Sequence, residues 1–177
     1  MTDLFKIILG SSIVTSFLTS IIAYIFHKKT ERTNAEIKRE FEILSHDFEW
    51  KQKTTELLGQ VYIHLNRTSR AFQNKYSKLE NYNAFYEDEI IFTSNKRIRD
   101  ILLENGHYLP PELLDEASKL IEHYDVWLVK YNNLRKVNND KSTIQIYVGP
   151  DGFNFPENAE EIFKEKYTKM FQSIRQL

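Results

Sequence analysis

The chain has 177 residues, which is enough for one compact domain with one appended segment but leaves little room for two independent cores. Only five Gly and four Pro are present, which argues against sandwiches, propellers and Gly-rich nucleotide folds, because these need many turns. The 24 Lys and Arg nearly balance the 25 Asp and Glu, which excludes a uniformly basic nucleic-acid coat, and the lack of Cys excludes disulfides, thiol nucleophiles and cysteine-ligated zinc.

The N-terminal segment is strongly apolar. Residues 7–26 form a run of 20 residues without a charge, followed by Lys28 and Lys29. As a helix this run is about 30 Å long, the thickness of the hydrocarbon core of a bilayer. We therefore expect a transmembrane helix, with residues 1–29 as a membrane anchor in contact with lipid. A cleavable signal peptide, which would have a shorter apolar region, and a buried helix of a soluble core are the alternatives.

One face of the predicted span is small and hydroxylated, whereas the opposite face is bulky and apolar. Small residues allow helices to approach closely in lipid, and hydroxyl groups can bond across the interface or line a narrow aqueous path. The sequence therefore predicts that this face oligomerises or lines a pore; its members are Ser11, Ser12, Thr15, Ser16, Thr19, Ser20 and Ala23. The alternative is that these hydroxyl groups bond to the carbonyl groups of their own helix. More Lys and Arg follow the span than precede it, which predicts a cytoplasmic C-terminal part.

A heptad-like seam follows the span. Ile37, Phe41, Leu44 and Phe48 begin a series of mainly apolar positions that step alternately by four and three residues as far as Leu79. This spacing predicts one long helix over residues 30–80, with a helical neck at residues 30–56 and a cytoplasmic helical domain at residues 57–177.

Further elements are expected within this domain. They are a short helix over 85–92, a helix from the N-cap Ser94 to Gly106, a helix that starts at Pro110-Pro111, a β-hairpin near 143–155 with a turn at Gly149–Gly152, and a last helix over 157–176. The predicted fold class is mainly α: a transmembrane helix, a long helical neck and a small cytoplasmic helical bundle with one short β-hairpin.

Catalytic motifs are lacking. The sequence has no His-Glu-x-x-His, no Walker loop and no Gly-x-Ser-x-Gly, so we expect no enzyme, no metal and no cofactor. Arg39 and His46 have the spacing of some helical defence ribonucleases, but such spacings arise by chance in a chain of this composition.

A local excess of positive charge is the best electrostatic signal. Between Glu56 and Glu80 no acidic residue occurs, and aromatic residues lie among the basic ones. Cations with stackable rings suit a nucleotide or a single-stranded oligonucleotide. The candidate anion-binding residues are Arg67, Arg70, Lys75, Lys78, Lys96, Arg97 and Arg99. The alternative is a solvated helix face that pairs with the acidic cluster at residues 87–89.

The order of a span, a helical neck and a helical head resembles single-pass membrane effectors of bacterial anti-phage defence systems. The resemblance implies a homo-oligomer in the bacterial inner membrane that forms a pore or ion channel gated by its cytoplasmic domain, in response to a nucleotide or oligonucleotide. The alternative is a passive anchor or scaffold that docks a cytosolic partner protein through Trp127 and Tyr131, two residues whose heptad phase also suits a core.

Overall fold

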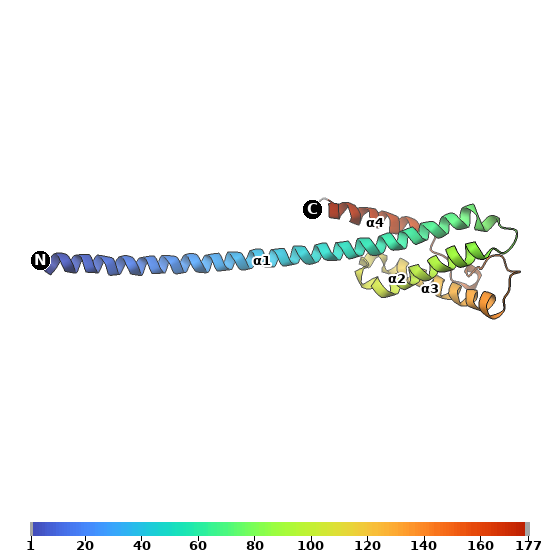
Figure 1. Ribbon diagram of the computed structural model, residues 1–177, viewed down its shortest axis with the longest axis horizontal. Helices are drawn as coiled ribbons and strands as arrows, with labels where there is room; N and C mark the ends of the chain where they lie inside the picture. Colours follow the sequence, from blue (N-terminus) through green and yellow to red (C-terminus); the bar gives the residue numbers. More distant parts are fainter. Residues whose placement is uncertain (1, 176–177) are drawn as a thin grey trace. The chain divides into compact units, whose positions relative to one another are not determined.

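The computed structural model describes the backbone of residues 2–175 and the side chains of residues 15–175. Its four α-helices are α1 (Thr2–Asn74), α2 (Thr93–Asn105), α3 (Leu114–Tyr131) and α4 (Ala159–Arg175), drawn in Figure 1. Contacts divide the chain into two compact units, Met1–Asp47 and Phe48–Leu177. The first unit is helical throughout its described part, whereas the second contains the rest of α1 and all the other elements.

The long helix predicted from the heptad seam is found, as part of the 73-residue helix α1. It ends at Asn74, and a single 3₁₀ turn follows at Tyr76–Lys78. The ring of Tyr76 is only 3 % exposed, so the chain turns where an aromatic side chain of the seam enters the interior. Before residue 48, the described hydrophobic side chains of α1 are exposed, among them Ile37, Phe41 and Leu44.

The transmembrane helix predicted at residues 7–26 is not found. Among the described residues, none of the helices combines the length and the apolar character needed to cross a bilayer. A span needs about 20 apolar residues. The side chains of α1 are described from residue 15, and the uncharged stretch there ends at Phe26. A charged stretch that contains Lys28, Lys29 and Glu31 follows. The prediction of a membrane span is therefore wrong for the described part of the chain.

The second unit is a bundle around a shared apolar core. Leu58, Val61 and Leu65 of α1 are at most 1 % exposed and belong to the same cluster as buried residues of α2, α3 and α4. Figure 1 shows α4 running back along this part of α1. The contacts agree, because Tyr167 stacks on Tyr62 and the carboxylate of Glu160 accepts a hydrogen bond from Asn66 at 2.6 Å. Burial of apolar surface between these helices is the main source of stability.

Two segments adopt π-helical geometry. The short helix predicted at residues 85–92 is confirmed and is the π-helix η2 (Phe85–Phe92), which continues into α2. The second, η5 (Asn132–Val137), extends α3. Ser94, predicted as an N-cap, instead lies buried inside α2. π-Helical turns are rare and frequently lie at functional sites, so these two segments direct attention to the part of the domain around them.

The β-hairpin predicted near residues 143–155 is wrong, since the described residues contain no strand. The segment from 141 to 148 is an irregular loop whose carbonyl groups bond to side chains of the helices. Arg135 donates to the carbonyl of Thr143, and Tyr76 donates to that of Ile144. The predicted turn is confirmed as a 3₁₀ turn at Gly149–Asp151, followed by Gly152 with φ at 90°, a conformation that glycine adopts without strain.

Candidate functional site: an aromatic cavity

The second unit encloses an open cavity of about 560 Å³ between α1, α2, α3, the irregular loop and the start of α4. This volume lies in the range of small-molecule sites in proteins. Aromatic side chains from every part of the wall except α2 and α4 dominate the lining: Phe72, Tyr76, Tyr124, Trp127, Tyr147 and Phe155. The aliphatic residues Leu65, Ile91, Ile146 and Val148 complete the apolar surface.

The positions of the aromatic residues follow from helix geometry. Tyr124 and Trp127 are three residues apart on α3, so they lie on the same face of the helix. Phe72 lies in the last turn of α1, and its ring centroid is 5.8 Å from that of Tyr76. Phe155 follows the Gly152 turn and lies 6.4 Å from the ring of Tyr124. The turn thus brings the segment before α4 back against α3.

The hydroxyl group of Tyr124 is a buried polar group in the wall of the cavity. Tyr124 is 2 % exposed, yet its hydroxyl group has no hydrogen-bond partner among the described residues. A buried polar group without a partner costs about 1–3 kcal/mol, so natural proteins rarely keep one without a reason. Burial also raises the pKa of the Tyr124 hydroxyl, which therefore stays protonated at neutral pH and can donate a hydrogen bond. A bound molecule with an acceptor atom would satisfy it.

Two further polar side chains line the same space. Asn95 of α2 is 5 % exposed, and no hydrogen bond joins its amide to another described residue. His123 is half-buried, and its Nδ1 lies 2.8 Å from the carbonyl oxygen of Phe153. Since a carbonyl group only accepts, Nδ1 carries the proton and donates, which leaves Nε2 as an acceptor in the neutral ring. Burial lowers the pKa of His123 and favours this neutral form, although the bond to Phe153 acts in the opposite direction.

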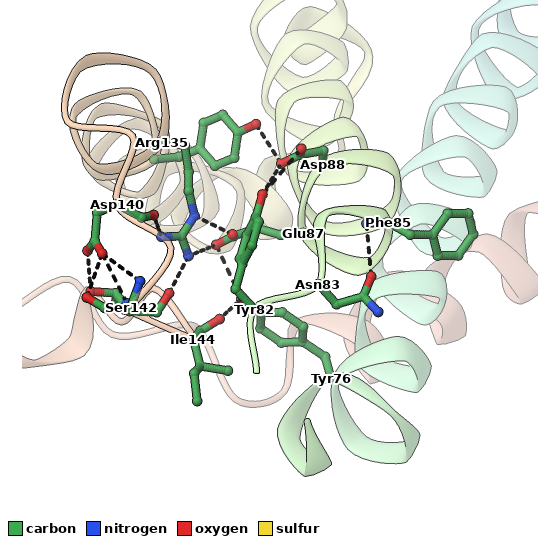
Figure 2. A network of polar contacts seen from close by, with 12 residues as sticks. Tyr76, Tyr82, Asn83, Phe85, Glu87, Asp88, Arg135, Asp140, Ser142 and Ile144 are labelled. Carbon is green, nitrogen blue, oxygen red and sulfur yellow. Dashed lines mark hydrogen bonds and ion pairs between the residues drawn. The ribbon is translucent and has the colours of Figure 1, made fainter. Parts of the chain in front are cut away.

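A buried ion pair holds the irregular loop that carries part of the cavity wall, as Figure 2 shows. Glu87 of η2 is fully buried, and Arg135 of η5 binds it through two contacts, Nε to Oε2 at 2.5 Å and Nη2 to Oε1 at 2.9 Å. Arg135 also donates to the carbonyl oxygens of Asp140 and Thr143, each at 2.6 Å. Each π-helix thus supplies one partner of the pair, and the guanidinium group ties both to the loop.

The phenol of Tyr76 connects this network to the cavity that it lines. Its hydroxyl group donates to the carbonyl oxygen of Ile144 at 2.8 Å and lies 3.3 Å from Oε1 of Glu87. Burial raises the pKa of Glu87, and the adjacent Arg135 opposes this rise. The next carboxylate, Asp88, accepts from the hydroxyl group of Tyr131 at 2.8 Å. The position of the loop therefore depends on charged groups that lie behind the aromatic wall.

The structure does not gather the predicted anion-binding residues into one site. Several are used inside the protein: Arg67 donates to the carbonyl of Glu89, Arg97 to Gln60, and Arg99 binds Asp125. Lys96 forms an ion pair with Asp100 at 3.9 Å. The other three, Arg70, Lys75 and Lys78, are exposed, and no ion pair joins them to another described residue. None of the seven lines the cavity.

The hydroxylated face predicted on α1 is partly described. Ser11 and Ser12 lie outside the residues whose side chains are described. Ser20 donates to the carbonyl of Ser16 at 2.9 Å, and Thr19 donates to that of Thr15 at 2.8 Å. Ala23 is exposed. The hydroxyl groups of Thr19 and Ser20 thus bond to their own helix, as in the alternative that the sequence left open.

Trp127 and Tyr131, predicted as either docking or core residues, are each 5 % exposed and belong to a second apolar cluster with Ile91, Ile146 and Val148. They are therefore not presented on the surface of the domain. The sequence did not indicate the cavity. Its only available signal was the concentration of aromatic residues around the Gly149–Gly152 turn and on one face of α3, which equally fits an ordinary core.

No group of three His, Cys, Asp or Glu residues suited to a metal ion occurs in the described part of the chain. Comparisons of the chain with protein-family models, with curated proteins and with solved structures find no match.

Proposed function

We propose that residues 48–177 form a binding module for a small aromatic molecule, which enters the cavity and accepts a hydrogen bond from Tyr124. The unpartnered hydroxyl group of Tyr124 carries this proposal, because it lies buried in the lining of an open, mostly apolar cavity of about 560 Å³. Apolar cavities with a few convergent polar groups are the usual form of small-molecule sites.

The polar groups of the cavity give the bound molecule an orientation. Tyr124 donates, the Asn95 amide both donates and accepts, and neutral His123 accepts through Nε2. The aromatic rings favour a flat molecule, because ring stacking adds about 0.5–1.5 kcal/mol per pair beyond the burial of area. A planar ring with one acceptor atom therefore matches the lining better than an aliphatic molecule of equal size.

Two probes of the same shape test this proposal. Quinoline and naphthalene have the same bicyclic outline, but only quinoline has a ring nitrogen that accepts a hydrogen bond. We expect the full chain to bind quinoline about 5- to 100-fold more tightly than naphthalene at neutral pH, because only quinoline satisfies a buried donor. Binding is followed by the fluorescence of Trp127 in a Trp50→Phe background, since Trp127 lines the cavity and Trp50 does not.

Tyr124→Phe is the matched variant, because it removes the hydroxyl group and keeps the ring. In this variant the two probes should bind with nearly equal affinity, and the protein should be as stable as the wild type or more stable, since a buried unpartnered group is lost. Failure of both probes to bind the wild type would refute the binding module. An unchanged preference for quinoline in Tyr124→Phe would refute the role of the hydroxyl group.

We also propose that the chain self-associates along α1. Ile37, Phe41 and Leu44 are 58 %, 71 % and 64 % exposed and are spaced by four and three residues, the seam of a coiled coil. A second copy presents the same seam and so matches it in length and spacing. Sedimentation equilibrium should show a dimer or larger oligomer that Phe41→Glu dissociates and Arg39→Glu, on the opposite face of the helix, does not. Monomeric wild type would contradict this.

A further inference from the structure

The charges of the cavity lining have one sign. Among the described residues that line it, the charged side chains are Glu157 and Glu160, and neither Lys nor Arg is present. His123 adds no positive charge at neutral pH, because burial lowers its pKa. A phosphate or carboxylate in the cavity would therefore meet two carboxylates and no cation. This lining disfavours the nucleotide predicted from the basic residues of the sequence.

The two carboxylates are available to a ligand. Glu160 accepts a hydrogen bond from the amide of Asn66 at 2.6 Å through Oε1, whereas neither a hydrogen bond nor an ion pair joins its Oε2 to a described residue. Glu157, just before α4, is exposed, and neither an ion pair nor a hydrogen bond joins its side chain to a described residue. Neither carboxylate is thus neutralised by a cation of the same domain, although both contact the cavity.

The aromatic rings of the lining also attract positive charge. The face of an aromatic ring carries partial negative charge, and a cation within about 6 Å of the ring centre gains about 0.5–2 kcal/mol, most strongly over Trp. Trp127, Tyr147, Phe72 and Phe155 reach the cavity from α3, the irregular loop, α1 and the segment before α4. Rings on several sides of one space, with carboxylates in its wall, are suited to a substituted ammonium group that has lost part of its water.

We propose that the ligand is an organic cation: an amine or quaternary ammonium group attached to an aromatic ring. This inference rests on the proposed function, since it names the chemical class that the same cavity binds. The ammonium group lies among the aromatic rings beside Glu157 and Glu160, and the ring of the ligand occupies the apolar part lined by Leu65, Ile146 and Val148. An acceptor atom on that ring takes the hydrogen bond of Tyr124.

A pair of probes with the same shape isolates the charge. Phenyltrimethylammonium and tert-butylbenzene differ only in the central atom of the branched group, which is a charged nitrogen in one and a carbon in the other. The full-length chain should bind phenyltrimethylammonium about 3- to 30-fold more tightly than tert-butylbenzene. Added salt should weaken the binding of the cation and leave that of the neutral probe unchanged, because salt screens the partly exposed carboxylates.

Two variants locate the effect without disturbing the core. Glu157→Gln removes one carboxylate at an exposed position and should lower affinity for the cation by about 2- to 5-fold while affinity for the neutral probe stays constant. Glu161→Gln is its control, because Glu161 is also exposed and does not line the cavity. Tyr147→Leu removes a ring that is 57 % exposed, so the fold tolerates the change, and it should also weaken the binding of the cation.

The outcomes separate this inference from the proposed function. Equal affinity for the two probes, or tighter binding of tert-butylbenzene, overturns the cation proposal and leaves the aromatic binding module intact. Equal effects of Glu157→Gln and Glu161→Gln also overturn it, because the cation would then lie elsewhere. If neither of these probes binds and quinoline does not bind either, the binding module itself is wrong, and the cation proposal falls with it.

Discussion

Removal of Arg135 tests whether the buried ion pair holds the domain together. Glu87 is fully buried and the side chain of Arg135 is 5 % exposed, so Arg135→Leu leaves a carboxylate without its partner and without water. Breaking such a pair costs about 3–5 kcal/mol. The variant also loses the hydrogen bonds from Arg135 to the carbonyls of Asp140 and Thr143. We therefore expect a loss of about 4 kcal/mol in the free energy of unfolding at neutral pH.

The pH dependence of this loss follows from Glu87. Burial already raises the pKa of Glu87 in the wild type, where Arg135 opposes the rise. Without Arg135 the folded-state pKa rises further, whereas that of the unfolded chain stays near about 4.3. A carboxyl group with a raised folded-state pKa destabilises the fold above its unfolded pKa, by up to about 1.4 kcal/mol per pH unit. Arg135→Leu should thus cost less at about pH 5 than at about pH 8.

Urea unfolding, followed by Trp127 fluorescence in the Trp50→Phe background, measures both effects. Arg70→Leu is the control, because Arg70 is exposed and forms no ion pair with a described residue. Replacing both members of the pair, as in Glu87→Met with Arg135→Leu, should recover most of the loss, since no charge stays buried. A cost below about 1 kcal/mol for Arg135→Leu at neutral pH, or a cost independent of pH, would refute the reasoning.

Three further predictions concern single positions, each read from urea midpoints. Thr54→Val should lose about 1–2 kcal/mol, because the fully buried Thr54 donates to the carbonyl of Tyr108 at 2.9 Å; an unchanged midpoint would contradict this. Gly59→Leu should lose about 1–3 kcal/mol, since even a Cβ there lies 3.0 Å from the ring of Tyr167; a higher midpoint would show that α4 packs elsewhere. Hydrogen bonds from the side chains of Ser142 and Thr143 lower the pKa of Asp140. The contribution of Asp140 to the stability of the fold is therefore complete above its unfolded pKa of about 3.9 and is lost as the pH falls towards its folded pKa. Asp140→Asn should flatten the acid dependence of stability, and an unaltered profile would exclude that role.

The helices of the domain were predictable because their apolar residues repeat with the period of a helix. Leu58, Leu65 and Tyr124 lie in this pattern and are buried in the structure. The turn at Gly149–Gly152 was equally clear, since few residues other than glycine adopt a positive φ. The helices and this turn are both determined by residues that are close together in the sequence, and contacts with distant residues do not change them.

The loop at residues 143–148 shows where local rules fail. Its alternating side chains are typical of a strand, but a strand needs a neighbour along its whole length. Here the carbonyl groups bond instead to Tyr76, which follows α1, and to Lys130 and Arg135, which lie on α3 and its extension η5. The sequence cannot reveal such an arrangement, because it depends on how the helices meet.

The candidate site was hidden for a similar reason. The sequence predicted a basic site from two segments, residues 67–78 and 96–99, but Arg67, Arg97 and Arg99 each bind a neighbouring group of the protein. The cavity collects residues from positions 65 to 160, and Tyr124 is indistinguishable from a core tyrosine until its missing partner is seen. The charge of the site is therefore a property of the fold and not of any one segment.

The NMR signals of the two tryptophan indole N–H groups give the most direct test of the aromatic binding module. Trp127 lines the cavity and Trp50 does not, and a spectrum of Trp50→Phe assigns the two signals. On titration of the full chain with quinoline, the signal of Trp127 should shift and saturate while that of Trp50 stays in place. A Trp127 signal that never moves, or two signals that drift together without saturation, would contradict a specific site in this cavity.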